Sequence, residues 1–168
     1  MTTDLLGANQ PTPIPAISLW QPWASFIAIG VKPYETRHWV APRQYIGKRI
    51  AIHAAKHKPD HDEYEWWQEV SKRNDPLPLG AFVCTALLRA VLRTEDVLKD
   101  DYGDYKVGRF AWYLTDIEAL DPPVPARGYQ GFWMWDRGVA PDPDAALRRG
   151  NDDETQNQIQ YIIRTHHP

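Results

Sequence analysis

The sequence predicts a mainly β domain with flanking helices, an α+β fold in which a small β-barrel carries helices on its outside. Two observations predict it: short alternating apolar runs are separated by turn residues, and just two stretches, 21–29 and 60–73, show helical spacing. A chain of 168 residues with 43% hydrophobic residues is also large and apolar enough to bury one core.

We expect this domain at residues 14–137. Residues 1–13 are polar, contain prolines and lack periodicity, which is typical of a flexible leader. Residues 138–168 are a polar tail dotted with prolines, with one candidate helix or strand at 156–164. The sequence has no run of about 18 apolar residues and no signal-peptide pattern, so we expect a cytoplasmic protein without a membrane partner.

The net charge of −3 hides an asymmetry along the chain. Residues 17–58 contain seven Lys and Arg against one acid, Glu35, a local charge of +6, and the remainder has twelve against twenty-one, or −9. Such a basic lobe favours a localised anionic ligand over the wrapping of a duplex; the alternative is an ordinary solvated surface. The single cysteine, Cys84, excludes a disulfide framework and is expected to be a buried, inert thiol.

The first elements lead into the most charged motif of the chain. Residues 17–20 are β-like, and the break at Gln21-Pro22 suits a helix start, because proline fits the first helical turn. Apolar residues then recur at helical spacing: Trp23, Phe26 and Ile27. Gly30 should end this helix, since glycine adopts the left-handed C-cap conformation without steric cost, and residues 34–40 again read as extended.

The motif itself holds Lys32, Glu35, Thr36 and Arg37. Lys32 lies just past the helix end and is expected to point away from the helix toward the groups beyond it. The alternative is that its favourable interaction with the helix dipole alone explains its position. In a strand, Glu35 and Arg37 share one face, opposite Thr36, so they either pair or bracket a ligand. If Lys32 is an electrostatic anchor, arginine should replace it; if it is a general base, arginine should not, because guanidinium keeps its proton.

Two stretches between this motif and the second helix offer further contacts. Residues 40–47 are a loop in which Arg43 is a candidate phosphate contact, and Lys48 begins a β-branched strand. His53 in that strand either faces the cleft with Lys32 or is a structural histidine.

Three histidines, His53, His57 and His61, invite a metal-site interpretation. Pro59 interrupts any helix between the last two. No cysteine or Glu-x-x-His pattern completes a ligand set. We therefore expect no metal and no cofactor.

Residues 60–73 are predicted to form the second helix. Asp60 and Glu63 have the spacing of a capping box. Trp66 and Trp67 point roughly 100° apart on such a helix. One of them is therefore expected in the core, and the other is free to stack.

The second half alternates strands with turns. Residues 81–92 are the strongest apolar run and predict a central strand or two bent strands, and residues 109–115 alternate as another. Between them, Thr94 is expected to cap a short helix with acids in its first turn, before a surface loop at 101–108. Residues 117–126, acidic and proline-rich, are predicted to be a turn.

The segment 127–135 has two interpretations. In one, polar and aromatic side chains line a pocket in which a base stacks: Arg127, Tyr129, Gln130 and Trp133. In the other, Gly128 and Gly131 mark a bulge, and the aromatic residues close the barrel.

Four blocks of the sequence carry a family resemblance. They are QPWASFIAIGVKPYETRHW at 21–39, KRIAIHAAK at 48–56, LGAFVCTALL at 79–88 and PVPARGYQGFWMW at 123–135. Together they resemble the ASCH (activating signal cointegrator homology) domain family, whose Gly-x-Lys-x-x-Glu-x-Arg core follows a hydrophobic helix. The resemblance covers residues 14–137 and implies a PUA-like small β-barrel that is associated with RNA or other nucleic acids.

The resemblance also implies two enzymatic alternatives. Some small members are amidohydrolases of acetylated cytidine nucleosides, which use a lysine, a threonine three residues later and a glutamate from a later strand. Here Glu35 stands three residues after Lys32, Thr36 comes one later, and the strand at 81–88 offers no acid. Ribonuclease activity has been proposed for other members and would use Lys32 and His53 as acid and base.

Three hypotheses follow. The preferred one is a module that binds nucleic acid, above all single-stranded RNA, or a modified nucleotide, with cations on phosphates and aromatic rings on bases. Its expected ligand contacts are Lys32, Glu35, Arg37, Arg43, Lys48, His53, Trp20, Trp23, Arg127 and Gln130. The second is a hydrolase of a modified nucleoside or of RNA, with Lys32, Glu35 and Thr36, or His53, in catalytic roles. The third is a protein-interaction module.

Overall fold

Ten helices and strands lie within residues 12–137, the part of the chain that the computed structural model describes. In chain order they are β1 (Ile14–Leu19), α1 (Trp23–Ala28), β2 (Tyr34–Arg37), the 3-10 helix η1 (Arg43–Tyr45), β3 (Arg49–Ala54), α2 (His61–Ser71), β4 (Ala81–Arg93), the 3-10 helix η2 (Thr94–Asp96), β5 (Phe110–Pro125) and β6 (Phe132–Trp135). Most of the predicted leader, and the predicted tail at 138–168 with its segment 156–164, lie outside the described residues.

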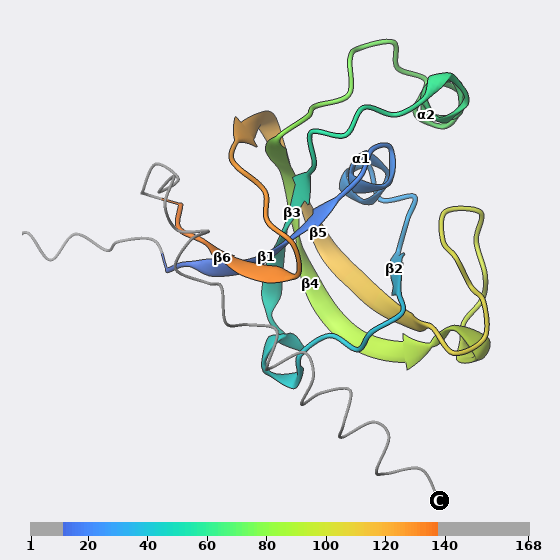
Figure 1. The fold of residues 1–168 in the computed structure, drawn as a ribbon, viewed down its shortest axis with the longest axis vertical. Helices are drawn as coiled ribbons and strands as arrows, with labels where there is room; N and C mark the ends of the chain where they lie inside the picture. Colours follow the sequence, from blue (N-terminus) through green and yellow to red (C-terminus); the bar gives the residue numbers. More distant parts are fainter. Residues whose placement is uncertain (1–11, 138–168) are drawn as a thin grey trace, which may run out of the picture. The chain divides into compact units, whose positions relative to one another are not determined.

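The six strands form one sheet in the order β2-β5-β4-β3-β1-β6 (Figure 1). All neighbours are antiparallel except β1 and β3, which are parallel. The β4–β5 ladder shifts register at three places, and such bulges bend a sheet. The edge strands β2 and β6 do not pair with each other within the described residues. The predicted mainly β fold with flanking helices is confirmed, and its barrel is an open, curled sheet.

Side chains bring the edge strand β6 into contact with β5, the strand next to the opposite edge of the curled sheet. Phe132 of β6 stacks on Trp112 of β5, with ring centroids 5.5 Å apart and planes 11° from parallel. Around this pair lies the main core, which takes aliphatic residues from the central strands and from α1: Ile17, Leu19, Ile27, Ile50, Ile52, Leu88 and Leu114. An aromatic contact therefore covers the core where no ladder closes the sheet.

The second helix reaches the sheet through the first. Trp67 of α2 is buried, and its ring centroid lies 5.7 Å from that of Phe26 in α1. Its neighbour Trp66 is half-buried and stacks on Tyr102, with centroids 5.4 Å apart. The prediction that one tryptophan enters the core is confirmed for Trp67, whereas Trp66, predicted to be free to stack, already packs on Tyr102 and Phe26.

The start of α2 also follows its sequence signal. Asp60 accepts a hydrogen bond from the backbone N–H of Glu63, and the Glu63 carboxylate accepts one from the backbone N–H of Asp60, each at 2.9 Å. The reciprocal pair satisfies two donors that a helix N-terminus leaves without partners. Neither α1 nor α2, within the described residues, is long and apolar enough to cross a membrane.

The predicted turn at 117–126 is wrong, because β5 continues to Pro125 and pairs there with Ala81 of β4. The prolines in this stretch suggested a turn, since proline removes a ladder donor. The short strand β2 pairs with β5 only as far as Tyr113, so beyond that residue β5 is an edge strand on one side. Proline is tolerated on an edge.

The predicted cap at Thr94 is also wrong. The residue preceding η2 is Arg93, and no side chain caps this helix. Thr94 is instead buried, and its hydroxyl contacts the backbone carbonyl of Lys106 at 2.8 Å. Its backbone N–H donates to the carbonyl of Arg109. Thr94 thus closes the base of the loop between η2 and β5, which extends over residues 97–109.

Candidate functional site

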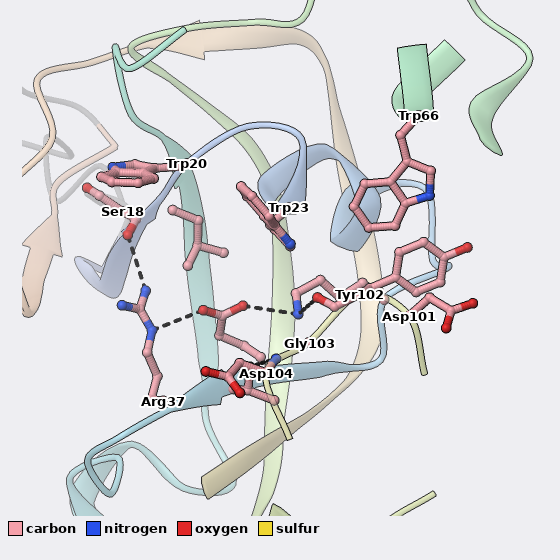
Figure 2. A pocket seen from close by; sticks show the side chains of 13 residues that line it. Ser18, Trp20, Trp23, Arg37, Trp66, Asp101, Tyr102, Gly103 and Asp104 are labelled. Atoms are coloured by element: carbon pink, nitrogen blue, oxygen red, sulfur yellow. Dashed lines mark hydrogen bonds and ion pairs between the residues drawn. The ribbon is translucent and has the colours of Figure 1, made fainter. Parts of the chain in front are cut away.

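A cavity of about 570 Å³ opens between α1, β2 and the 97–109 loop (Figure 2). Its lining comes from segments that are far apart in the sequence: Ser18, Leu19, Trp20, Trp23, Lys32, Glu35, Thr36, Arg37, Trp66, Asp101, Tyr102, Gly103 and Asp104. We call this cavity the pocket. It contains the whole charged motif that the sequence singled out.

Lys32 lies at the inner wall of the pocket. Gly30, with φ of +82°, ends α1 in the left-handed conformation as predicted, and the chain then turns Lys32 inward. The side chain is 1% exposed. Its Nζ donates to the carbonyls of Tyr34 and Tyr102, each at 2.7 Å, and lies 3.4 Å from a carboxylate oxygen of Glu35. All three N–H groups of the ammonium therefore have acceptors inside the protein.

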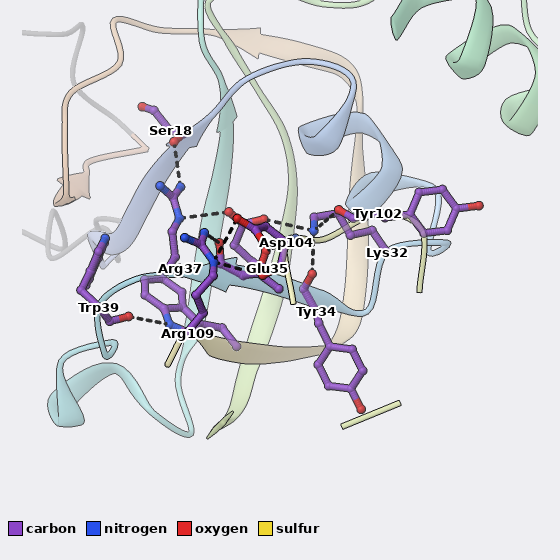
Figure 3. A network of polar contacts seen from close by, with 11 residues as sticks. Ser18, Lys32, Tyr34, Glu35, Arg37, Trp39, Tyr102, Asp104 and Arg109 are labelled. Atoms are coloured by element: carbon purple, nitrogen blue, oxygen red, sulfur yellow. Dashed lines mark hydrogen bonds and ion pairs between the residues drawn. The ribbon is translucent and has the colours of Figure 1, made fainter. Parts of the chain in front are cut away.

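Glu35 joins Lys32 to Arg37 in one polar chain, which Figure 3 shows along β2. Arg37 Nε lies 3.0 Å from Glu35 Oε1, so the prediction that these residues share a face is confirmed. The Arg37 guanidinium also donates to the carbonyl of Ser18 at 3.3 Å. The carboxylate of Glu35 is thus held between two cations at the floor of the pocket.

Thr36 fastens the long loop to β2. Its hydroxyl oxygen accepts a hydrogen bond from the backbone N–H of Asp104 at 2.9 Å. On the other side of the loop, Arg109 donates to the carbonyls of Asp104 and Thr36. Gly103 passes so close that an added Cβ would lie 2.9 Å from the Thr36 methyl group. These contacts hold the loop, with Asp101 and Asp104, against the pocket.

Aromatic rings form the walls above this polar floor. Trp20 and Trp23 flank the turn into α1, and Trp66 stacks with Tyr102 at the other end (Figure 2). The buried side chain of Gln21 fixes the turn from below: its amide donates to Ser25 Oγ and to a backbone carbonyl, each at 2.8 Å. The wall formed by Trp20 and Trp23 is therefore held by a hydrogen-bonded turn.

The pocket does not have the basic character that the sequence predicted. Among its lining residues Lys32 and Arg37 are positive, whereas Glu35, Asp101 and Asp104 are negative. Both cations are already paired with Glu35. The basic charge of residues 17–58 does not predict the charge of the pocket, because the loop that brings Asp101 and Asp104 into the pocket lies about seventy residues further along the chain.

Comparison with known proteins decides the family. The family model of the ASCH domain matches residues 17–124, well over half of the chain. The chain belongs to the ASCH domain family. The resemblance of the Gly-x-Lys-x-x-Glu-x-Arg core is thereby confirmed, and the pocket of this ASCH domain is built around that core.

Solved structures that match the chain include those of an ASCH protein from Zymomonas mobilis, two of which are mutant proteins. Each shares 18% sequence identity with this ASCH domain, at a TM-score of 0.47. The alignments cover 87% or 88% of this chain and between 93% and 96% of the other. No curated protein matches the chain.

Five predicted contacts of this ASCH domain lie outside the pocket: four exposed side chains and the buried His53. Arg43 and Lys48 are exposed around η1, which Figure 1 shows at the end of the sheet away from α1. Arg127 and Gln130 are exposed on the segment before β6. The basic stretch 17–58 therefore contributes cations both to the pocket, with Lys32 and Arg37, and to the surface around η1, with Arg43 and Lys48.

His53 is a structural histidine and does not face the pocket with Lys32. It is buried, with Nδ1 3.1 Å from Ser18 Oγ and Nε2 3.0 Å from the carbonyl of Ala126. Gly128 packs so tightly on it that an added Cβ would lie 2.4 Å from the ring. The glycine of this segment therefore makes room for His53, an explanation that the bulge interpretation did not include.

Burial lowers the pKa of His53 from its ordinary value of 6.5, and the charge of Lys56 acts in the same direction, against the hydrogen bond to Ala126. As the pH falls below about 6.5, unfolded His53 gains a proton and folded His53 does not, so stability is lost. We expect the free energy of unfolding to fall by up to about 1.4 kcal/mol per pH unit more in the wild type than in His53→Gln. Urea titrations at pH 7.5 and 5.5 measure this, and a difference between the proteins that does not narrow at the lower pH would contradict it.

Two remaining candidates carry no chemistry in the pocket. Cys84 lies in the core, and burial raises the pKa of its thiol to about 12, as expected of an inert thiol. Within the described residues one group has the spacing of metal ligands, His61, Asp62 and Glu65 at the start of α2. All three side chains are exposed, and nothing buried orients them.

Proposed function

We propose that this ASCH domain binds a nucleotide base in the pocket, from RNA or another single-stranded nucleic acid, or as a modified nucleoside. One observation carries the proposal: aromatic rings stand around a floor made of an ion-paired carboxylate and guanidinium. The family is associated with RNA binding or hydrolase activity. The volume of about 570 Å³ lies within the range of small-molecule sites.

The walls supply stacking. Trp20 and Trp23 lie on one side of the cavity, and Trp66 and Tyr102 on the other. A base that enters between them exchanges water for the faces of aromatic rings, an interaction that tolerates any base because every base has a π-face. The hydrogen bonds of Gln21 hold the turn that carries Trp20 and Trp23, so these two rings need little ordering on binding.

The floor supplies the hydrogen bonds to the edge of a base. Glu35 presents an acceptor beside the donors of Arg37, and Asp104 offers a second carboxylate at the same side. The edge of a base likewise presents donors next to acceptors, so adjacent groups of both kinds can read it. With three carboxylates and two paired cations, the pocket favours the base over the phosphate.

The test measures binding of the four ribonucleoside monophosphates and of acetylated cytidine by calorimetry. We expect Trp23→Ala to weaken the best ligand about fivefold to a hundredfold, the range for loss of one stacked ring. Arg43→Ala is the matched control, because Arg43 is exposed and lies outside the pocket, and it should leave this affinity unchanged. If none of these ligands binds to the wild type, or if both variants weaken binding equally, the base-binding proposal is wrong.

A second candidate is hydrolysis of a modified nucleoside, and the position of the loop favours it. Asp101 and Asp104 bring into the pocket the carboxylate that β4 lacks, beside Lys32 and Thr36. Lys32 Nζ, however, already donates to two backbone carbonyls and pairs with Glu35 in this structure, so a substrate would have to displace one of these partners to reach it. Chromatography of the same ligands after incubation with the protein shows whether any of them is hydrolysed. If the second candidate is correct, Asp104→Asn abolishes that hydrolysis.

A further inference from the structure

The mouth of the pocket carries an aromatic and basic cluster, of which the proposed function uses Trp20 alone. Trp20, a large apolar side chain that lines the pocket, is 58% exposed. His57 stacks on it, with ring centroids 4.4 Å apart and planes 27° from parallel. Lys56 and Lys58 are exposed on either side of His57. We call these four residues the rim.

We propose that the rim is a second nucleotide subsite, which binds the nucleotide adjoining the one whose base enters the pocket. The inference rests on the proposed function and deepens it, because it makes the ligand a single strand of nucleic acid. A free nucleoside would occupy the pocket alone and leave the rim empty.

Stacking is the first argument. Trp20 both lines the pocket and touches His57, so the two rings lead outward from the cavity. His57 is exposed, and the face that it turns away from Trp20 is open to a base. Aromatic rings placed in sequence along a groove are the usual platform for successive bases of a single strand.

Charge is the second argument. The cations of the pocket, Lys32 and Arg37, are already paired with Glu35 and cannot neutralise a phosphate without losing that partner. Lys56 and Lys58, in contrast, form no ion pair within residues 12–137. The phosphate between two nucleotides, which the pocket disfavours, therefore finds its cations at the rim.

The rim is also fixed in place. The backbone N–H of Ala55 donates to the carbonyl of Leu19 at 2.8 Å, which holds the segment after β3 beside the turn that carries Trp20. The stem of Lys56 crosses Gly80, where an added Cβ would lie 3.0 Å from it. The rim is therefore preformed, and binding needs little ordering of the chain at this point.

The experiment compares a fluorescein-labelled RNA hexamer of mixed sequence with the ribonucleoside monophosphates, by anisotropy and by competition. We expect the wild type to bind the hexamer at least about tenfold more tightly than any monophosphate. In Lys56→Gln/Lys58→Gln, the plot of log affinity against log salt should flatten by about 1.4, or 0.7 for each lost phosphate contact. His57→Ala should weaken the hexamer about fivefold to a hundredfold and leave monophosphate binding unchanged.

Lys72→Gln/Arg73→Gln is the matched control, since it removes two adjacent exposed cations from the end of α2 and should not change the salt slope. Equal affinities of the wild type for hexamer and monophosphate, or an unchanged hexamer affinity in both rim variants, would overturn the second subsite alone. If the wild type binds neither the monophosphates nor the hexamer, the proposal of a base-binding pocket is wrong as well.

Discussion

Lys32→Met is expected to destabilise the domain by about 3–5 kcal/mol, the usual cost of breaking a buried ion pair by removal of one partner. Methionine fills a similar volume but donates nothing. The change would leave the carbonyls of Tyr34 and Tyr102 without a donor and Glu35, which is 6% exposed, with Arg37 as its remaining partner. Urea denaturation followed by circular dichroism measures the loss.

Lys106→Met makes the same chemical change in the same loop as Tyr102. Its side chain is 83% exposed and has one ion pair, at 3.7 Å from Asp104, so we expect a change within about 0.5 kcal/mol. Lys32→Arg is also expected to destabilise the domain, because three acceptors enclose Nζ and leave no room for a guanidinium. This replaces the simple anchor role, in which arginine would substitute for lysine. A loss below about 1 kcal/mol in Lys32→Met would show that the network contributes little.

Trp112→Ala should destabilise the domain by about 3–5 kcal/mol as well, through a different mechanism. Trp112 is fully buried, lies opposite Glu35 in the pairing of β5 with β2, and packs edge-on against Trp39 and face-on against Phe132. Its removal leaves a cavity where the two ends of the sheet meet. Thermal unfolding and urea titration both report the effect.

Trp20→Ala is the matched change at an exposed tryptophan. We expect it to lower the free energy of unfolding by about 1 kcal/mol or less, because removing the Trp20 ring breaks one stacking contact, with His57, and exposes little buried area. The two variants should therefore separate stability from binding. Trp112→Ala lowers the free energy of unfolding, and Trp20→Ala lowers the affinity for the ligand. Equal destabilisation by both would contradict the assignment of Trp20 to the pocket mouth.

Local spacing predicted those features that local geometry determines. Gly30 adopts its left-handed conformation, and Asp60 and Glu63 cap each other, because each depends on residues within one helical turn. Glu35 and Arg37 share a face because side chains alternate along any strand. These features could be predicted without knowledge of the tertiary fold.

The features that sequence reasoning missed depend on contacts between distant segments. Asp104 reaches the pocket because its backbone N–H bonds to Thr36, sixty-eight residues earlier in the chain. In the loop's own sequence, the nearness of Asp104 to two tyrosines and a glycine is the one signal that distinguishes it from a solvated acid. Arg43 was misplaced for the converse reason, because charge summed along a chain does not tell which face each residue occupies.

The pairing of β1 with β6 sets the order in which the domain can be completed on the ribosome. β1 is the first strand to emerge, yet its outer neighbour is the last strand of the sheet, with Ile14 opposite Trp135. Until β6 is synthesised, Ala16, Ala51 and Phe82 lack their partner Trp133. Between the synthesis of β1 and that of β6 the nascent chain therefore exposes an unpaired strand and part of its apolar interior, a state in which chaperones and unwanted pairing compete with folding.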